Sequence, residues 1–279
     1  MLQLSADGST VSRPPPVVVG GIGGSGTRVV VQLLQSAGVC MGNRLNASLD
    51  MLDFVPQFEA HIQSILSVVR SASYSVADIA AAERTTLFTA LKAIIAGLEQ
   101  EAGGRAWGWK NPRIIYLLPF VHALVPQMRF VHVVRDGRDM ALSGNQNQLR
   151  TYGRDILGNN ATDAVAAVRF WQVVNMSVMA WCQRHLPGRY LCLRYEDLLH
   201  APCSSAAILL EFIAPLRPTG AATDSVAIER WRAGLRASPG IGRWQSLTPS
   251  LQHAIGQASA EGLAHFGYQP AASGLTLAT

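Results

Sequence analysis

The first candidate site is a glycine-rich stretch, VVVGGIGGSGTRVV, at residues 17–30. Valines that predict a buried strand precede the glycines, and an apolar pattern with helical spacing follows them. A loop between a strand and a helix presents free backbone N–H groups and the positive end of the helix dipole, which together bind phosphate. The sequence therefore predicts a phosphate site. Its candidate residues are Gly23, Gly24, Ser25, Gly26, Thr27 and Arg28.

Two common nucleotide-binding motifs fit this loop only in part. GxxxxGK[ST] can be aligned from Gly21, but Thr27 then takes the place of the lysine and Arg28 that of the serine or threonine. Gly21, Gly23 and Gly26 fit GxGxxG. However, no strand ending in Asp or Glu follows about 20 residues later, as dinucleotide binding requires. The loop alone leaves the kind of phosphate ligand open.

A second candidate phosphate contact follows the apolar run RFVHVV at 129–134. Arg135 comes directly after this run, and Ser143 comes eight residues later. A guanidinium fork and a hydroxyl so placed can bind one phosphate together. The alternative is a structural turn whose charges bridge one another. Its members would be Arg135, Asp136, Arg138 and Asp139.

The elements that would position these residues alternate between strands and helices. Apolar runs predict strands at 17–19, 107–110, 129–134 and 189–195. Helical patterns lie between them, which favours a three-layer α/β fold around a mainly parallel central sheet. The predicted helices are 27–38, 75–104, 113–126, one from the RDGRD turn to about Gln148, and 164–186. The ends lack such patterns, so we expect a flexible arm at 1–16, one domain at 17–270 and a loose tail at 271–279.

The overall composition restricts the class of protein. The chain has 279 residues, 49% of them hydrophobic, which is enough for one domain with a large core. A net charge of +5 favours anionic partners, but without a Lys/Arg-rich run we expect no nucleic acid. No apolar run reaches the ~18 residues of a membrane span, so we expect a cytoplasmic protein without a membrane partner. The scattered cysteines predict reduced thiols and no metal site.

Five short motifs together resemble the sulfotransferase family, above all its bacterial and tyrosylprotein branches. They are GSGTR at 24–28, WGWKNPR at 107–113, Arg135 with Ser143, LRYEDLL at 193–199 and GIGRW at 240–244. The resemblance runs from about residue 17 to 270. It implies a P-loop-like fold and the co-substrate 3′-phosphoadenosine 5′-phosphosulfate (PAPS), and it implies no metal ion.

The resemblance also implies how PAPS would bind. The glycine loop would hold the 5′-phosphosulfate, and Arg135 with Ser143 would hold the 3′-phosphate. Tyr195, Arg243 and Trp244 would enclose the adenosine end. All these residues match family motifs at their own positions in this chain.

The catalytic cation and base are less directly implied. Relatives carry Lys or Arg directly before Ser-Gly-Thr, where this chain has Gly24. Lys110 of WGWKNPR is then the leading candidate for a cation near the transferred group, and Arg28 could replace part of the missing charge. Tyrosylprotein-type relatives take the base from the segment after the first helix, which implies Asp50 or Asp53.

Other interpretations of the candidate bases stay open. Ser48 or Asp50 could instead cap a short helix. His132 lies in the middle of a predicted strand, where a buried structural imidazole is favoured over a base. Trp107 and Trp109 share one strand face and are expected to pack in the core rather than line a pocket.

The expected function is transfer of a sulfonate group from PAPS to a hydroxyl group of a small-molecule acceptor. The alternatives are a non-catalytic protein that binds PAPS or its product, and a kinase-like P-loop enzyme. Acceptor contacts are expected from 43–75 and 145–162, whose polar residues fit a sugar or small alcohol as well as a solvated loop. The sequence indicates no oligomeric state.

Overall fold

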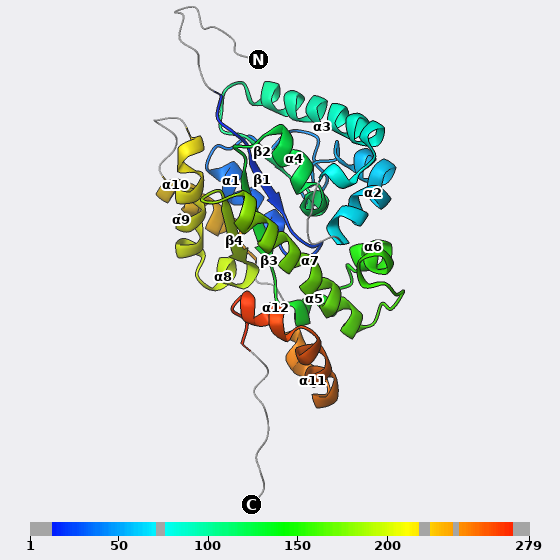
Figure 1. Ribbon diagram of the computed structural model, residues 1–279. Coiled ribbons are helices and arrows are strands. Elements are labelled where there is room, and N and C mark those ends of the chain that lie inside the picture. Colours follow the sequence, from blue (N-terminus) through cyan, green and yellow to red (C-terminus); the bar gives the residue numbers. More distant parts are fainter. Residues whose placement is uncertain (1–12, 71–75, 218–223, 237–239, 270–279) are drawn as a thin grey trace, which may run out of the picture.

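The computed structural model describes residues 13–70, 76–217, 224–236 and 240–269, and a parallel sheet of four strands lies at its centre (Figure 1). The strand order is β2-β1-β3-β4. Val18 pairs with Trp109 and Phe130, and Val131 pairs with Leu191. The four predicted strands and their parallel arrangement are confirmed. The strands are β1 Val17–Gly20, β2 Gly108–Lys110, β3 Arg129–Val134 and β4 Tyr190–Arg194.

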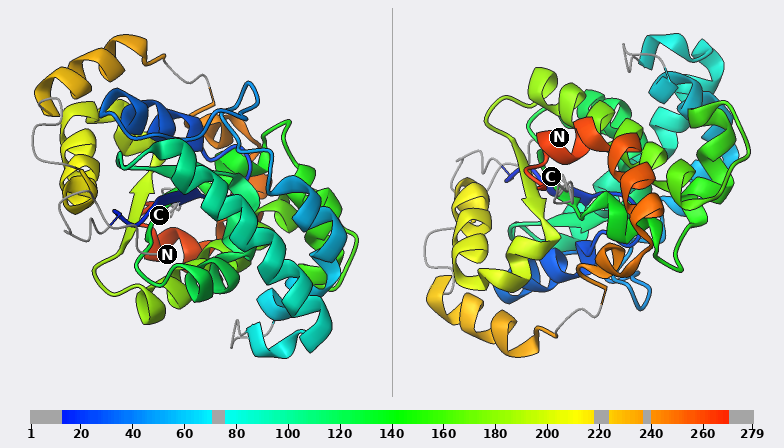
Figure 2. Two further views of the ribbon diagram at one scale, coloured as in Figure 1. Left: turned by 90° about the horizontal axis from the view of Figure 1, so that it is seen from above. Right: turned by 90° about the horizontal axis from the view of Figure 1, so that it is seen from below.

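Helices cover both faces of the sheet (Figure 2). Successive side chains of a strand point to opposite faces, so the consecutive valines of β1 place apolar groups on both of them. Val17 and Val19 pack in one core with α1 Thr27–Ser36, α9 Pro202–Ile213 and α10 Asp224–Gly234. Val18 points into a second core, which contains α2 Val55–Arg70, α3 Ala81–Ala102, α4 Leu118–Leu124 and α7 Ala164–His185. These layers confirm the three-layer α/β fold.

The remaining elements follow the last strand or connect the larger helices. α11 and α12 pack against α7 at one end of the molecule (Figure 1). No helix among the described residues is long and apolar enough to cross a membrane. These elements are α8 Tyr195–His200, α11 Pro249–Ala258, α12 Ala260–His265, and the short 3₁₀ helices η1 Val76–Asp78, η3 Ala214–Leu216 and η4 Arg243–Ser246.

Trp107 and Trp109 are core residues, as predicted. Both are buried, and their ring centroids lie 5.9 Å apart. The indole N–H of Trp107 donates to the carbonyl of Pro14 (2.8 Å), which ties the residues before β1 to the sheet. The rest of the predicted arm, residues 1–12, and the predicted tail at 271–279 lie outside the described residues.

His132 is a buried structural imidazole, which confirms the interpretation favoured by its place in the strand. Its ring nitrogens hydrogen-bond to the Tyr190 hydroxyl and to the side-chain oxygen of Asn175, both at 3.0 Å. Burial lowers the pKa of His132 to about 4. The imidazole is therefore neutral near pH 7. Because it is fully buried, it cannot take a proton from a substrate in a solvent-accessible site.

The helix predicted from the RDGRD turn to Gln148 is wrong. α5 Gly137–Ala141 ends early, and α6 Asn147–Leu157 begins after a turn. The amide of Gln146 donates to the carbonyls of Met140 (2.7 Å) and Ser143 (3.0 Å), so its side chain closes the turn that follows α5. Ser143 therefore lies in a turn and not in a helix.

Two other predicted helices are shorter than expected. The segment 113–126 is divided into a 3₁₀ helix, η2 Pro112–Tyr116, and α4. Pro119 stands in the first turn of α4, where its missing N–H would break a continuous helix but costs nothing at a helix start. The segment 75–104 contains η1 and then α3, which begins only at Ala81.

Candidate active site

The glycine loop connects the carboxyl end of β1 to the start of α1. Gly24 and Gly26 have φ angles of 96° and 89°, which residues other than glycine rarely adopt. Gly26 lies against Tyr195, because a Cβ atom on Gly26 would come within 2.1 Å of the tyrosine ring. α1 begins at Thr27, and the first N–H groups of a helix have no partner within it. The loop therefore offers backbone donors at this edge of the sheet.

Two side chains add polar groups to the loop. Ser25 is buried, and its hydroxyl has no hydrogen-bond partner among the described residues. Arg28 is exposed. Burial lowers the pKa of Lys110, the nearby Asp50 opposes this shift, and the charge of Arg28 adds to it. The guanidinium of Arg28 is thus near enough to Lys110 to act on it electrostatically.

Arg135 and Ser143 both approach the loop at Gly24. Nη1 of Arg135 donates to the Gly24 carbonyl (3.5 Å), and the guanidinium lies 5.0 Å from the centre of the Tyr195 ring. A Cβ atom on Gly24 would lie 3.6 Å from the Ser143 hydroxyl. Nε and Nη2 of Arg135 are buried and have no partner among the described residues. The structure therefore brings Arg135, Ser143 and the loop together, and two guanidinium nitrogens stay available to a ligand.

Asp136 and Arg138 brace the turn that follows Arg135. Asp136 accepts hydrogen bonds from the backbone N–H of Arg138 (2.9 Å) and from its Nη2 (2.7 Å), and both residues are buried. Arg135 forms no ion pair with a carboxylate in the described part of the chain. The turn is thus braced by Asp136 and Arg138, whereas Arg135 points to the glycine loop.

The loop at 240–246 covers Arg135. A Cβ atom on Gly240 would lie 2.5 Å from Nη2 of Arg135 and 3.4 Å from Nε of Arg243, so the backbone closely approaches both guanidinium groups. Asp139 holds this loop, since its carboxylate accepts two backbone N–H groups from it, the nearer at 2.6 Å. Burial raises the pKa of Asp139, and these hydrogen bonds oppose the shift. Nε of Arg243 is buried and unpaired among the described residues.

The three residues expected at the adenosine end have different surroundings. Tyr195 borders the glycine loop and Arg135, as described above, and Arg243 belongs to the covering loop and lies against Gly240. Trp244 is buried in a small apolar cluster, and the Arg138 guanidinium lies 3.7 Å from the centre of its ring. Trp244 therefore anchors the covering loop in the core.

Lys110 lies at the end of β2 and is only 2% exposed. Its ammonium group donates to the Ser48 carbonyl (2.7 Å) and forms an ion pair with Asp50. Asn46 fixes that carboxylate, because its amide donates to Oδ2 of Asp50 (3.0 Å) and its oxygen accepts the backbone N–H of Asp50 (2.9 Å). The leading candidate cation and one of the two candidate bases thus form one unit.

Asp53 is not part of this unit. It forms an ion pair with Arg44 (2.6 Å) and lines a separate surface hollow. The alternative that Ser48 or Asp50 caps a helix is wrong, because the next helix, α2, begins only at Val55. The chain between α1 and α2 instead returns along β2, since the backbone N–H of Met51 donates to the Lys110 carbonyl (2.6 Å).

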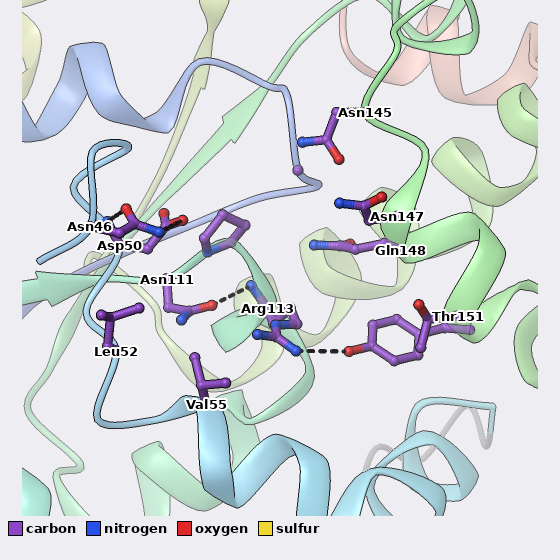
Figure 3. A pocket seen from close by; sticks show the side chains of 13 residues that line it. Asn46, Asp50, Leu52, Val55, Asn111, Arg113, Asn145, Asn147, Gln148 and Thr151 are labelled. Carbon is purple, nitrogen blue, oxygen red and sulfur yellow. Dashed lines mark hydrogen bonds between the residues drawn. The ribbon is translucent and has the colours of Figure 1, made fainter.

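A cavity of about 390 Å³ extends from Gly23 of the glycine loop to Asp50 (Figure 3). Its walls come from both segments expected to contact an acceptor. The amide side chains of Asn145, Asn147 and Gln148 face this cavity from the side opposite Asp50 (Figure 3). The cavity therefore joins a candidate phosphate site, a candidate base and a polar wall.

One residue of the site, Asn46, lies outside the five motifs. It stands four residues before Asp50, and an Asn that accepts nearby backbone N–H groups is a common turn signal, so this role had a local sequence signal. Gly240 belongs to the GIGRW motif, but its closeness to Arg135 arises only when the covering loop folds back over Arg135.

Two of three comparisons with known proteins find sulfotransferases. A model of the sulfotransferase family matches residues 15–214, more than two thirds of the chain. No curated protein sequence is significantly similar to this chain. The sulfotransferase domain of the olefin synthase of Synechococcus PCC 7002 superposes with a TM-score of 0.53 at 16% identity, over 97% of this chain and 100% of that domain. A sulfotransferase from Mycobacterium avium gives a TM-score of 0.53 at 13% identity, over 93% of this chain and 79% of the other.

Proposed function

The chain belongs to the sulfotransferase family, and we propose that it transfers the sulfonate group of PAPS to a hydroxyl group of a small polar acceptor. The observation that carries this proposal is the meeting of Arg135, Ser143 and the glycine loop at Gly24. Buried donors without partners cost free energy, and a phosphate oxygen would satisfy those of Arg135. A ligand with two phosphate-bearing ends, such as PAPS, fits this arrangement.

In the proposed complex each part of the site takes one part of PAPS. The N–H groups of Gly23–Thr27 and the dipole of α1 bind the 5′-phosphosulfate. Arg135 and Ser143 bind the 3′-phosphate, and Tyr195 and Arg243 border the adenosine. Trp244 holds the covering loop in place from the core.

The proposed reaction is an in-line displacement at sulfur. A bond forms between the acceptor oxygen and sulfur, the bond between sulfur and the 5′-phosphate oxygen breaks, and the hydroxyl proton passes to Asp50. Lys110 stabilises the charge that develops on the departing phosphate. Arg28 supplies the positive charge that relatives carry directly before Ser-Gly-Thr, at the position of Gly24.

One alternative function has an observation in its favour. A non-catalytic PAPS-binding protein would explain why the loop has Gly24 where relatives have a cation. The buried Lys110 in contact with Asp50 supports catalysis instead, since a binding protein needs no such pair at the cavity. The kinase-like alternative lacks such an observation, because Thr27 occupies the place of the P-loop lysine.

Two measurements test the proposed function. In calorimetric titration the purified protein is expected to bind 3′-phosphoadenosine 5′-phosphate (PAP) tightly and ATP weakly or not at all. A preference for ATP would contradict the proposal. Transfer of labelled sulfonate from PAPS to a panel of alcohols then separates an enzyme from a binding protein, because only an enzyme labels an acceptor.

A further inference from the structure

We propose that the acceptor carries a carboxylate in addition to its hydroxyl group, and that Arg113 binds this carboxylate in the cavity. The inference rests on the proposed function, because it assigns the second substrate of that reaction. It identifies the acceptor as a hydroxylated carboxylic acid of the sugar-acid type.

The cavity contains two charged side chains of opposite sign. Asp50 and Arg113 are the charged side chains that line it. The charge of Asp50 is compensated by Lys110. Arg113 has no carboxylate within ion-pair distance in the described part of the chain, so the cavity carries an uncompensated positive charge. A bound anion would compensate this charge in a site that is partly shielded from water.

Neighbouring residues hold Arg113 in place. Its backbone N–H donates to the side chain of Asn111 (3.0 Å), and its Nη1 donates to the Tyr152 hydroxyl (3.4 Å; Figure 3). Its guanidinium lies 5.1 Å from the centre of the Phe58 ring. These contacts orient the guanidinium and use few of its five N–H donors. The planar fork that remains matches the two oxygens of a carboxylate.

The cavity wall next to Arg113 carries amide side chains. Asn145, Asn147 and Gln148 line the cavity, and the side-chain oxygen of Gln148 accepts a hydrogen bond from Tyr116 (3.0 Å), which leaves its NH₂ group for a ligand. Amide groups both donate and accept hydrogen bonds, as hydroxyl groups require. A ligand that offers several hydroxyl groups beside its carboxylate therefore fits this wall.

The test compares matched pairs of acceptors. D-Glucuronate, quinate and shikimate are each offered beside their methyl esters, with labelled PAPS as donor, and kcat/KM is measured. We expect the acid of at least one pair to be used about tenfold better than its ester or more, as for a charge-assisted hydrogen bond. Arg113→Gln should remove this preference. Arg154→Gln, which alters an exposed arginine of α6 outside the cavity, should keep it.

Three results would overturn the inference: acids and esters used equally or not at all, a preference that survives in Arg113→Gln, or a preference for glucose 6-phosphate over glucose without any for a carboxylate. PAP titration of the same samples distinguishes failure of the acceptor assignment from failure of the proposed function. If PAP binds normally, only the assignment of the acceptor fails, whereas loss of PAP binding in the wild-type protein refutes the proposed function itself. Thermal melting of Arg113→Gln checks that the variant is folded.

Discussion

The ammonium group of Lys110 is buried at the end of β2 and forms an ion pair with the carboxylate of Asp50, which comes from the loop between α1 and α2. Burial lowers the pKa of Lys110, and Asp50 opposes this shift. In the proposed reaction Asp50 loses its negative charge when it takes the acceptor proton. The charge of Lys110 is then no longer compensated and can act on the departing phosphate. In the proposed reaction this contact couples proton removal to stabilisation of the leaving group.

Lys110→Met is expected to lower kcat on the order of 100-fold, as for loss of a donor that acts on the transition state. PAP affinity should change little, because the charge develops only during transfer. Single-turnover transfer and PAP titration measure the two effects. Lys92→Met alters an exposed lysine of α3 and serves as the control. Turnover of Lys110→Met at the wild-type level would remove Lys110 from the chemistry.

Replacement of the two candidate bases should give unequal results. Asp50→Asn is expected to lower kcat by about 10²-fold or more, because an amide cannot take the acceptor proton. Asp53→Asn should retain nearly full activity, since Asp53 pairs with Arg44 away from Lys110. The same transfer assay measures both variants. The assignment of the base is wrong if Asp53→Asn is the more impaired of the two.

The sheet and the glycine loop could be predicted from sequence because both have local signals. The valines of β1 mark a strand buried on both faces, and the glycines that follow mark a loop in which φ is positive. The choice between Asp50 and Asp53 had no such signal. It depends on where the loop after α1 crosses β2, which is set by tertiary contacts such as the hydrogen bond from Met51 to the Lys110 carbonyl.

The position of Ser143 shows a second limit of local patterns. Its segment has an apolar spacing that suits a helix. Nothing in that spacing reveals that the side chain of Gln146 donates hydrogen bonds to the carbonyls of Met140 and Ser143. The family motif nevertheless singled out Ser143, because the motif records the residue and not its secondary structure. The closeness of Ser143 to Gly24 was therefore easier to anticipate than the element that carries Ser143.

Arg135→Ala should weaken PAP binding by roughly 2 kcal/mol, about 30-fold, because two charged donors at the 3′-phosphate are lost. Calorimetric titration measures the change. Arg184→Ala, at an exposed position of α7, is the matched control and should bind PAP like the wild-type protein. Equal PAP affinity of the two variants would refute the assignment of the 3′-phosphate to Arg135.

Gly26 and Gly38 flank α1 and have similar φ angles, 89° and 84°. The variants Gly26→Ala and Gly38→Ala therefore form a matched pair. Either change should destabilise the fold by about 1 kcal/mol or more through backbone strain. Only at Gly26 would the new Cβ atom collide with Tyr195, whereas no atom lies within 4 Å of it at Gly38. We therefore expect a loss of PAP affinity for Gly26→Ala alone. Equal PAP affinity of both variants would show that the contact with Tyr195 does not shape the site.

His132 should make the fold less stable in acid. Burial lowers its pKa to about 4, below the value of 6.5 for an unperturbed histidine, so between these values the unfolded chain binds a proton that the folded chain excludes. The free energy of unfolding should therefore fall by about 2 kcal/mol between pH 7 and pH 5 on account of this residue.

Urea unfolding of the wild-type protein and of His132→Gln at both pH values isolates this effect. Burial also raises the pKa values of the acids Asp139 and Glu196. Both proteins contain these acids, so their contributions to the pH dependence of stability cancel in the comparison. The wild-type protein should lose more stability than the variant as the pH falls. If the variant does not fold, an NMR titration of the wild-type imidazole gives the same information. A His132 ring that takes up a proton near pH 6.5 in the folded protein would contradict its assignment as a neutral structural residue.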